Sequence, residues 1–316
     1  MTEPTVEIDV EGVDSLWSDE EGSVYTPSIA SVHEWKFGRR YGSGSYQFPN
    51  DEPEQARLNI CHEAFLLLLE NRLFLAPINP DSMRILDIGT GTGVWAIEMS
   101  NLYPLATTIV GKDLSPIQPP WGPPNVEFML DDIEEDWTET QPYGYIHCRY
   151  MAGSIGNWPR LVRQCYQNLR PGGWVEFQET ICSPYSEDGS LEPSHKLVEL
   201  IRLLVDACNR VGRSLDPGPS LKGWLQDAGF TGIRLRYIKS PIGTWPKDPR
   251  LKEIGLLLAL NLIEGIDAFT AVPFREAMGW SPNEITAFNE AARKDLRRRN
   301  THAIFDIMVI TAQKPE

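Results

Sequence analysis

Three alternate glycines, Gly89, Gly91 and Gly93, have the spacing in this sequence that most clearly predicts chemistry. They stand between a short apolar run and a stretch whose apolar residues recur at helical spacing, which indicates a strand, a tight turn and a helix start. Glycine lets the backbone approach a ligand closely, and the N–H groups of the first helical turn can face that ligand. The turn is therefore expected to hold a nucleotide-type cofactor.

The residues around these glycines separate the cofactor classes that use such a turn. Val94 stands where a dinucleotide site requires its third glycine, and the Gly-Lys-Ser/Thr of a phosphate-binding P-loop is absent. Instead, Asp87 lies two positions before the first glycine, and Asp113 ends the next apolar run. A carboxylate at that strand end can accept hydrogen bonds from both hydroxyls of a ribose. A plain strand turn without a ligand would account for the glycines but not for the two acids.

The pattern Asp-x-Gly-x-Gly-x-Gly at 87–93 resembles motif I of the class I S-adenosylmethionine (SAM) methyltransferases. The resemblance implies SAM as the cofactor and S-adenosylhomocysteine as its product. It also implies which residues contact each part of the cofactor. These are Asp87, Gly89, Thr90, Gly91 and Gly93 at the methionine end, Asp113 and Leu114 at the ribose, and Asp132 and Ile133 at the adenine. His147 or Arg149, after the fourth strand, is a further cofactor residue. A salt bridge that holds the turn would explain Arg149 equally well.

Apolar runs alternate with helical patterns from residue 84 onward, which predicts an α/β fold. Strands are expected at 84–88, 107–110, 126–130, 145–149, 174–179, 233–239 and 304–312. Helices are expected at 51–75, 94–103, 158–169, 191–211, 220–228, 251–265 and 282–299. The resemblance implies a Rossmann-like seven-stranded sheet with the order 3-2-1-4-5-7-6 and an antiparallel last strand. The aromatic, glycine-rich segment 34–49 has neither period, so it is expected to be a loop across a pocket.

The length of 316 residues favours one large domain with insertions. We expect an acidic disordered leader at 1–33, since residues 1–21 carry eight acids and the first basic residue is Lys36. A single SAM methyltransferase domain is expected at 34–316, with cap elements at 34–80, 184–222 and 241–280.

Composition and charge argue against several classes of partner. The net charge of -15 is unlike that of a nucleic-acid binder, and the basic cluster at 293–299 is short and interrupted. No apolar stretch reaches the ~18 residues of a membrane span. The five cysteines show no metal-ligand spacing and are expected to be buried in a reducing compartment. Without a signal-peptide pattern, the protein is expected in the cytoplasm or the nucleus.

Five further segments narrow the family. They are Tyr-x-Phe-Pro-Asn-Asp-Glu at 46–52, Gly-x-Asp-Leu-Ser-Pro-Ile-Gln-Pro at 111–119, Asp-Asp-Ile-Glu-x-x-Trp at 131–137, the 146–159 segment that ends in Trp-Pro, and Pro-Ile-Gly-x-Trp-Pro-Lys-Asp-Pro at 241–249. Together they are similar to the fungal LaeA-like methyltransferases. That family includes regulators of secondary metabolism with velvet-domain partners and tailoring enzymes of biosynthetic clusters. Lys112 and Asn157 depart from the family pattern, and Lys112 is expected to weaken the hold of Asp113 on the ribose.

Methyl transfer from a sulfonium is an in-line displacement, so the protein mainly has to align the reacting atoms. The acceptor pocket is expected beyond the carboxyl ends of the strands. Candidate acceptor-binding residues are Tyr41, Tyr46, His62, Glu179 and Trp245, of which Tyr46 and His62 are also catalytic candidates.

Three functions remain open at this stage. The first is methylation of a small secondary metabolite, with oxygen favoured over nitrogen or carbon. The second is a regulatory role through a velvet-type protein partner, with the acidic leader as a contact. The third is a non-methylating reaction on the same fold. The Asn-Pro-Pro-Tyr motif of enzymes that methylate nucleic-acid amino groups is absent, which argues against DNA or RNA as acceptor.

Overall fold

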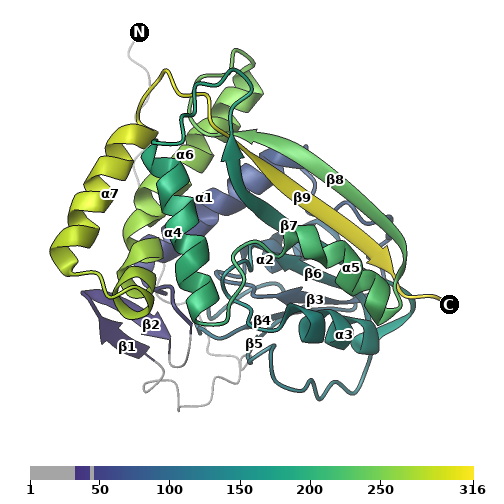
Figure 1. The fold of residues 1–316 in the computed structure, drawn as a ribbon. Helices are drawn as coiled ribbons and strands as arrows, with labels where there is room; N and C mark the ends of the chain where they lie inside the picture. Colours follow the sequence, from purple (N-terminus) through teal and green to yellow (C-terminus); the bar gives the residue numbers. More distant parts are fainter. Residues whose placement is uncertain (1–32, 43–45) are drawn as a thin grey trace, which may run out of the picture.

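The structure is a computed structural model that describes residues 33–42 and 46–316 (Figure 1). Its main element is a seven-stranded sheet with the order β5-β4-β3-β6-β7-β9-β8. The strands are β3 Arg84–Ile88, β4 Thr108–Asp113, β5 Val126–Leu130, β6 Tyr143–Arg149, β7 Leu169–Tyr185, β8 Thr231–Pro241 and β9 Ile304–Gln313. Counted from β3, this is the predicted order 3-2-1-4-5-7-6. β9 is antiparallel to β7 and β8, so the predicted sheet is confirmed.

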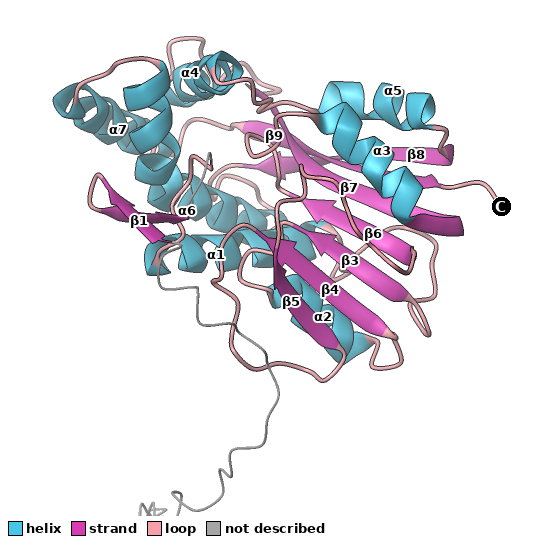
Figure 2. Ribbon diagram, turned by 90° about the horizontal axis from the view of Figure 1, so that it is seen from below, coloured by secondary structure: helices cyan, strands magenta, loops and turns pink. Residues whose placement is uncertain are grey.

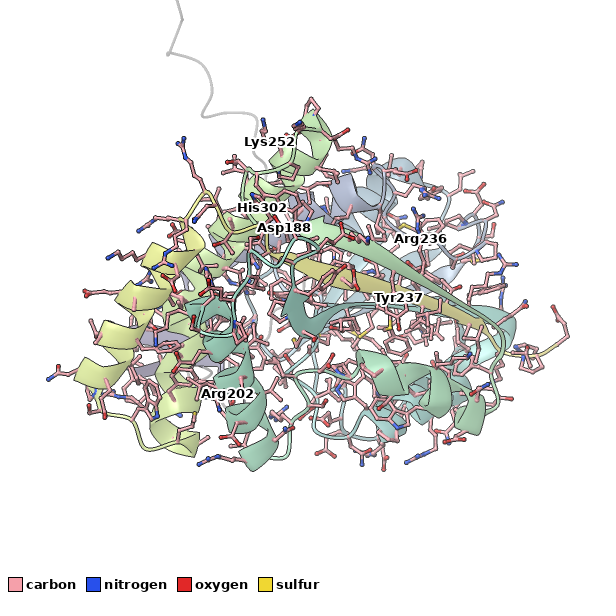
Figure 3. All side chains as sticks on the ribbon, turned by 45° about the horizontal axis from the view of Figure 1, so that its top comes forward. Asp188, Arg202, Arg236, Tyr237, Lys252 and His302 are labelled. Atoms are coloured by element: carbon pink, nitrogen blue, oxygen red, sulfur yellow. The ribbon has the colours of Figure 1, made fainter. Side chains whose placement is uncertain are left out.

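Burial along the strands follows their place in the sheet. β6, in the middle, is buried at six of its seven residues, and β9 is buried at eight of its ten. Such strands are covered on both faces, which explains their continuous apolar sequence. β8 is the edge strand and is largely exposed. Its Arg236 and Tyr237 reach the surface in Figure 3, and Tyr237 is 54% exposed.

The helices form two groups. Figure 2 shows α3 Trp158–Asn168 and α5 Gly218–Ala228 on one face of the sheet and α2 Val94–Leu102 on the other. The second group forms a cap beyond the carboxyl ends of the strands. It consists of α1 Glu52–Leu68, α4 Lys196–Arg210, α6 Pro249–Val272, the π-helical turn η2 Pro273–Ala277 and α7 Pro282–Leu296. The cap is thus assembled from chain segments far apart in sequence.

The segment 34–49 is not wholly a loop, and this prediction was wrong. β1 His33–Lys36 and β2 Arg39–Gly42 form a two-stranded antiparallel hairpin, joined through Phe37 and Gly38, whose φ angles are +53° and +76°. Positive φ at both central residues matches the right-handed twist of a hairpin. The strands are four residues each, too short to show a clear alternation. The expected leader, apart from His33, lies outside the described residues.

Helix boundaries differ from the predictions by five residues or more at three places, one of which is the start of α4, at Lys196 instead of 191. α1 begins as predicted, with the Asp51 side chain accepting from the Glu54 N–H, but it ends at Leu68. Glu70 and Asn71 have φ near +60°, a conformation that ends a helix. α6 continues past Gly265, where an end was predicted. A Cβ at Gly265 would lie 2.5 Å from the Phe269 ring, so this glycine provides room for packing.

The helical segment Pro249–Ala277 is long and apolar enough to cross a membrane by length and composition alone, with a mean hydropathy of 1.6. Half of the most apolar 18-residue stretch of this segment is buried inside the protein, where α6 packs against α1 and α7 among others. A core helix of a soluble protein passes the same test, so this is weak evidence for a membrane span.

Candidate active site

A cavity lies beyond the carboxyl ends of β3, β4, β5 and β6, and we name it the strand-end cavity. The space between its walls is about 1040 Å³, including its opening to solvent. Its lining contains eight of the predicted cofactor residues: Gly89, Thr90, Gly91, Asp113, Leu114, Asp132, Ile133 and Arg149. The other three, Asp87, Gly93 and His147, lie behind this lining.

The glycine turn has the backbone that the sequence predicts. The φ angles of Gly89, Gly91 and Gly93 are +66°, +57° and +79°, a region that side chains other than glycine rarely adopt. A Cβ at Gly89 would lie 2.2 Å from Met151 Sδ, and one at Gly93 would lie 2.4 Å from the Phe128 ring. Two of the glycines are therefore also needed for packing, while Gly91 faces the cavity.

Asp87 supports the turn from behind. Its Oδ2 accepts a hydrogen bond from the Thr90 hydroxyl at 2.7 Å, and its Oδ1 lies 2.7 Å from His147 Nδ1. The His147 ring stacks on Trp95 at 4.0 Å between centroids. Register explains the contact with His147, because Asp87 and His147 are paired residues of neighbouring strands β3 and β6. Both carboxylate oxygens of Asp87 are thus engaged within the protein.

Asp113 occupies the position expected of a ribose acid. Its two oxygens accept the N–H groups of Gly91 and Ser115, each at 2.8 Å. Burial raises the pKa of Asp113 to about 6, although these N–H groups act in the opposite direction. A carboxylate oxygen has two lone pairs, so each can accept a further hydroxyl.

The two departures from the family pattern have structural roles. Lys112 Nζ lies 2.7 Å from Asp131 and 2.6 Å from Glu139. Successive residues of a strand point to opposite faces, so the Lys112 ammonium is directed away from the Asp113 carboxylate. Lys112 therefore makes no direct contact with Asp113 that could produce the predicted weakening of its hydrogen bonds to a ribose. Asn157 caps α3 by accepting the Arg160 N–H at 3.0 Å.

Arg149 and His62 meet at the wall of the strand-end cavity. Arg149 Nη2 donates to His62 Nδ1 at 2.7 Å, because a guanidinium has no acceptor. Burial, with the nearby Arg149 charge, lowers the pKa of His62 to about 3, so its imidazole is neutral. Arg149 Nη1 is buried and has no partner among the described residues. A buried cationic N–H without a partner favours an anionic or carbonyl ligand at this point.

A second cavity, which we name the cap cavity, adjoins the first. It lies between α1, α4 and α6 and the ends of β7 and β9, with about 1100 Å³ between its walls. The two cavities share five lining residues: Tyr46, Leu58, Cys61, Tyr150 and Ser154. The remainder of the cap cavity is mainly apolar, whereas the strand-end cavity includes the carboxylates of Asp113, Asp131 and Asp132.

The five acceptor candidates separate into two groups. Tyr46 lines both cavities, and His62 lines the strand-end cavity. Tyr41, Glu179 and Trp245 line neither. Tyr41 is 1% exposed and packs in the core.

The other two candidates outside the cavities have structural contacts. The Glu179 carboxyl group accepts the N–H groups of Met151 and Ala152 at 2.9 and 3.2 Å. Trp245 packs on the His302 ring at 5.1 Å. His302 also contacts Asp188, its neighbour in Figure 3, with Nδ1 2.5 Å from the carboxylate.

Sequence reasoning missed the polar group of the cap cavity, which consists of Glu54, Arg57 and Asn261. Glu54 and Arg57 are three residues apart on α1, a spacing that places them side by side. Asn261 is a polar residue inside the apolar run of α6, and that interruption was the available signal.

Comparisons with known proteins agree with this geometry. A family model described as "Methyltransferase domain" matches residues 60–235. "Methyltransferase pytC" of Aspergillus terreus is 50% identical over 98% of this chain and 96% of its own length. "Secondary metabolism regulator LAE1" of Cochliobolus heterostrophus is 37% identical over 89% of this chain and 93% of its own length. "Secondary metabolism regulator laeA" of Aspergillus fumigatus is 33% identical over 87% of this chain and 74% of its own length. The chain therefore belongs to the methyltransferase domain family and, within it, to the fungal LaeA-like methyltransferases.

Proposed function

We propose that this chain is a SAM-dependent methyltransferase that methylates an oxygen of a small metabolite. The observation that carries the proposal is that two adjoining cavities share a wall. The strand-end cavity contains the glycine turn and Asp113, and the cap cavity is apolar and shares a wall with it. A cofactor in the first and an acceptor in the second would meet at that wall.

The lining of the strand-end cavity fits SAM in three places. Asp113 can accept the ribose hydroxyls with the free lone pairs of both oxygens. Asp132 and Ile133 line the cavity beyond the end of β5 and would bind the adenine in this proposal. Arg149 Nη1, buried and unpartnered among the described residues, suits the methionine carboxylate. The methionine end is thus assigned to Arg149 and the glycine turn, with Asp87 holding that turn.

When bound, SAM supplies an electrophilic methyl group on a sulfonium. The protein's own residues act by alignment and by exclusion of water. Neither catalytic candidate is placed to act as the base, so the proton of the acceptor hydroxyl passes to water at the opening of the strand-end cavity. The neutral His62 ring already accepts from Arg149, and burial raises the pKa of Tyr46 so that it keeps its proton. We assign Tyr46, at the wall between the cavities, the role of positioning the acceptor by hydrogen bonding.

Transfer of a labelled methyl group tests the proposal. Purified protein with tritiated SAM should label a small-molecule extract, and the product mass should increase by one methylene group. Asp113→Ala serves as the control because it removes the ribose acid. If calorimetry detects no SAM binding to the unaltered protein, the proposed function is refuted.

A regulatory role is the second candidate function, and the similarity to proteins named as secondary metabolism regulators favours it. In that case a velvet-type protein, rather than a metabolite, would be bound or labelled. The labelling experiment, repeated with purified velvet-domain protein, separates the two roles. A tagged chain that accumulates in the nucleus, as opposed to the cytoplasm, would support the regulatory role.

A further inference from the structure

The cap cavity is lined by apolar side chains from α1, α4, α6 and β9 and from the loops beside them. Leucines, isoleucines and phenylalanines form most of its wall: Phe48, Phe65, Leu200, Ile201, Leu204, Leu215, Ile242, Leu258, Leu262, Phe269, Phe305 and Ile307. Each Å² of apolar surface buried against such a wall contributes roughly 25 cal/mol to binding. An occupant with an apolar body is therefore favoured over a polar one.

Glu54 and Arg57 are the charged residues of this lining, and they neutralise each other. Arg57 Nε donates to Glu54 Oε2 at 3.0 Å, and Nη2 donates to Oε1 at 2.5 Å. The side chains are 3% and 4% exposed. An anionic occupant would lose its hydration and meet the Glu54 carboxylate as well as the Arg57 guanidinium, so the cavity offers it no net attraction.

Unused hydrogen-bond donors remain at this charge pair. Arg57 Nη1 also donates to Asn261 Oδ1 at 2.6 Å, so three of its five N–H groups have partners. Asn261 Nδ2 donates to the Tyr150 hydroxyl at 3.3 Å and keeps a second N–H. The guanidinium lies 5.0 Å from the Phe269 ring centroid, at the edge of the apolar wall. These donors can bind an oxygen of a molecule in the cavity.

We propose that the cap cavity takes an uncharged acceptor with an apolar body and a hydrogen-bond-accepting oxygen, which meets Arg57 and Asn261. Glu54 has a specific role in this scheme. It cancels the charge of Arg57, so that the guanidinium acts as a neutral donor and anionic molecules are rejected. This inference rests on the proposed function, because it assigns the cap cavity to the acceptor.

A matched pair of fluorescent probes tests the charge preference. N-Phenyl-1-naphthylamine is uncharged, and 1-anilinonaphthalene-8-sulfonate has the same rings with one sulfonate added. We expect the fluorescence of the uncharged probe to rise on binding and the sulfonate to bind at least ~10-fold more weakly, a difference of about 1.4 kcal/mol. Equal or tighter binding of the sulfonate would overturn the proposal.

Two tryptophan variants of α6 show whether the probe occupies the cap cavity. Leu258 lines the cavity and is 7% exposed, whereas Leu256, on the same helix, is 45% exposed and lies outside it. Leu258→Trp should reduce binding of the uncharged probe at least ~10-fold, while Leu256→Trp should leave it unchanged. Unchanged binding in Leu258→Trp contradicts the assignment of the cavity.

The role of Glu54 is tested by charge. Glu54→Gln leaves Arg57 without its counter-ion and should shift the preference toward the sulfonate by at least ~10-fold. If this variant fails to fold, the double variant Glu54→Gln/Arg57→Gln, which is again uncharged, should retain the parent preference. A double variant that favours the sulfonate would refute the role of the pair.

SAM binding, measured by calorimetry on the same samples, separates this inference from the proposed function. Wild-type protein that binds the uncharged probe but not SAM refutes the proposed function alone. Protein that binds SAM but does not distinguish the probes refutes the inference alone.

Discussion

Protonation of Asp113 should weaken SAM binding as the pH falls through about 6. Burial raises the pKa of this carboxyl to about 6, above the usual range for aspartate. The ribose hydroxyls donate hydrogen bonds, so they favour the ionised carboxylate, and binding must lower this pKa. SAM affinity is therefore full above pH 6 and is lost progressively below it.

The size of the effect follows from the titration. At pH 5 roughly one molecule in eleven carries an ionised Asp113, so the affinity should be about 10-fold lower than at pH 7, or ~1.4 kcal/mol. Two neighbouring groups keep their protonation state in this window. His62, with a pKa near 3, remains neutral. Glu179, whose pKa burial raises to about 8, remains protonated.

Titration calorimetry between pH 5 and pH 7 measures this dependence. Two buffers of different ionisation enthalpy should report nearly one proton released per SAM bound at pH 5 and almost none at pH 7. Asp113→Asn cannot ionise, so its affinity should be independent of pH and roughly 30-fold weaker than that of the wild type at pH 7, given ~2 kcal/mol for the lost charge-assisted bonds. A flat profile for the wild type, or an equal slope in Asp113→Asn, would refute the assignment of Asp113 to the ribose.

Three further predictions concern stability. Asp87→Asn keeps the size of the side chain but loses one of two buried acceptor oxygens, so chemical denaturation should show a free energy of unfolding lower by about 2–3 kcal/mol. An unchanged denaturation midpoint would contradict the supporting role of Asp87. Gly255→Ala places a Cβ 2.0 Å from Gly243 O and should lower the free energy of unfolding by at least ~2 kcal/mol. Gly223→Ala, inside α5, meets no atom within 4 Å and should stabilise the protein by up to ~1 kcal/mol. Equal melting temperatures of the two variants would argue against this packing. Ser281→Ala removes the capping box of α7 and should cost about 1 kcal/mol in the same assay, and a neutral result would show that the cap contributes nothing.

Local sequence signals predicted most of the elements correctly because their causes are local. The seven strands are where the apolar runs predict them. For the interior strands the cause is that a strand covered on both faces needs apolar residues throughout. Helix starts at Asp51, Asn157 and Ser281 have side-chain caps, which act within three residues. The hairpin at 33–42 escaped prediction because its strands are too short to show an alternation. The continuation of α6 beyond Gly265 escaped prediction because it depends on packing against Arg57, which is far away in the sequence.

The sequence alone predicted a cofactor site at the glycine turn and its two acids, since spacing along the chain determines strand, turn and helix start. It could not show that Asp87 has both carboxylate oxygens engaged within the protein. The register between β3 and β6 sets His147 against Asp87 and engages its carboxylate, while Asp113 reaches the cavity from the neighbouring strand. The acceptor side depends still more on tertiary structure. Arg57 and Asn261 are 204 residues apart, and only the packing of α1 on α6 makes them hydrogen-bond partners in one cavity.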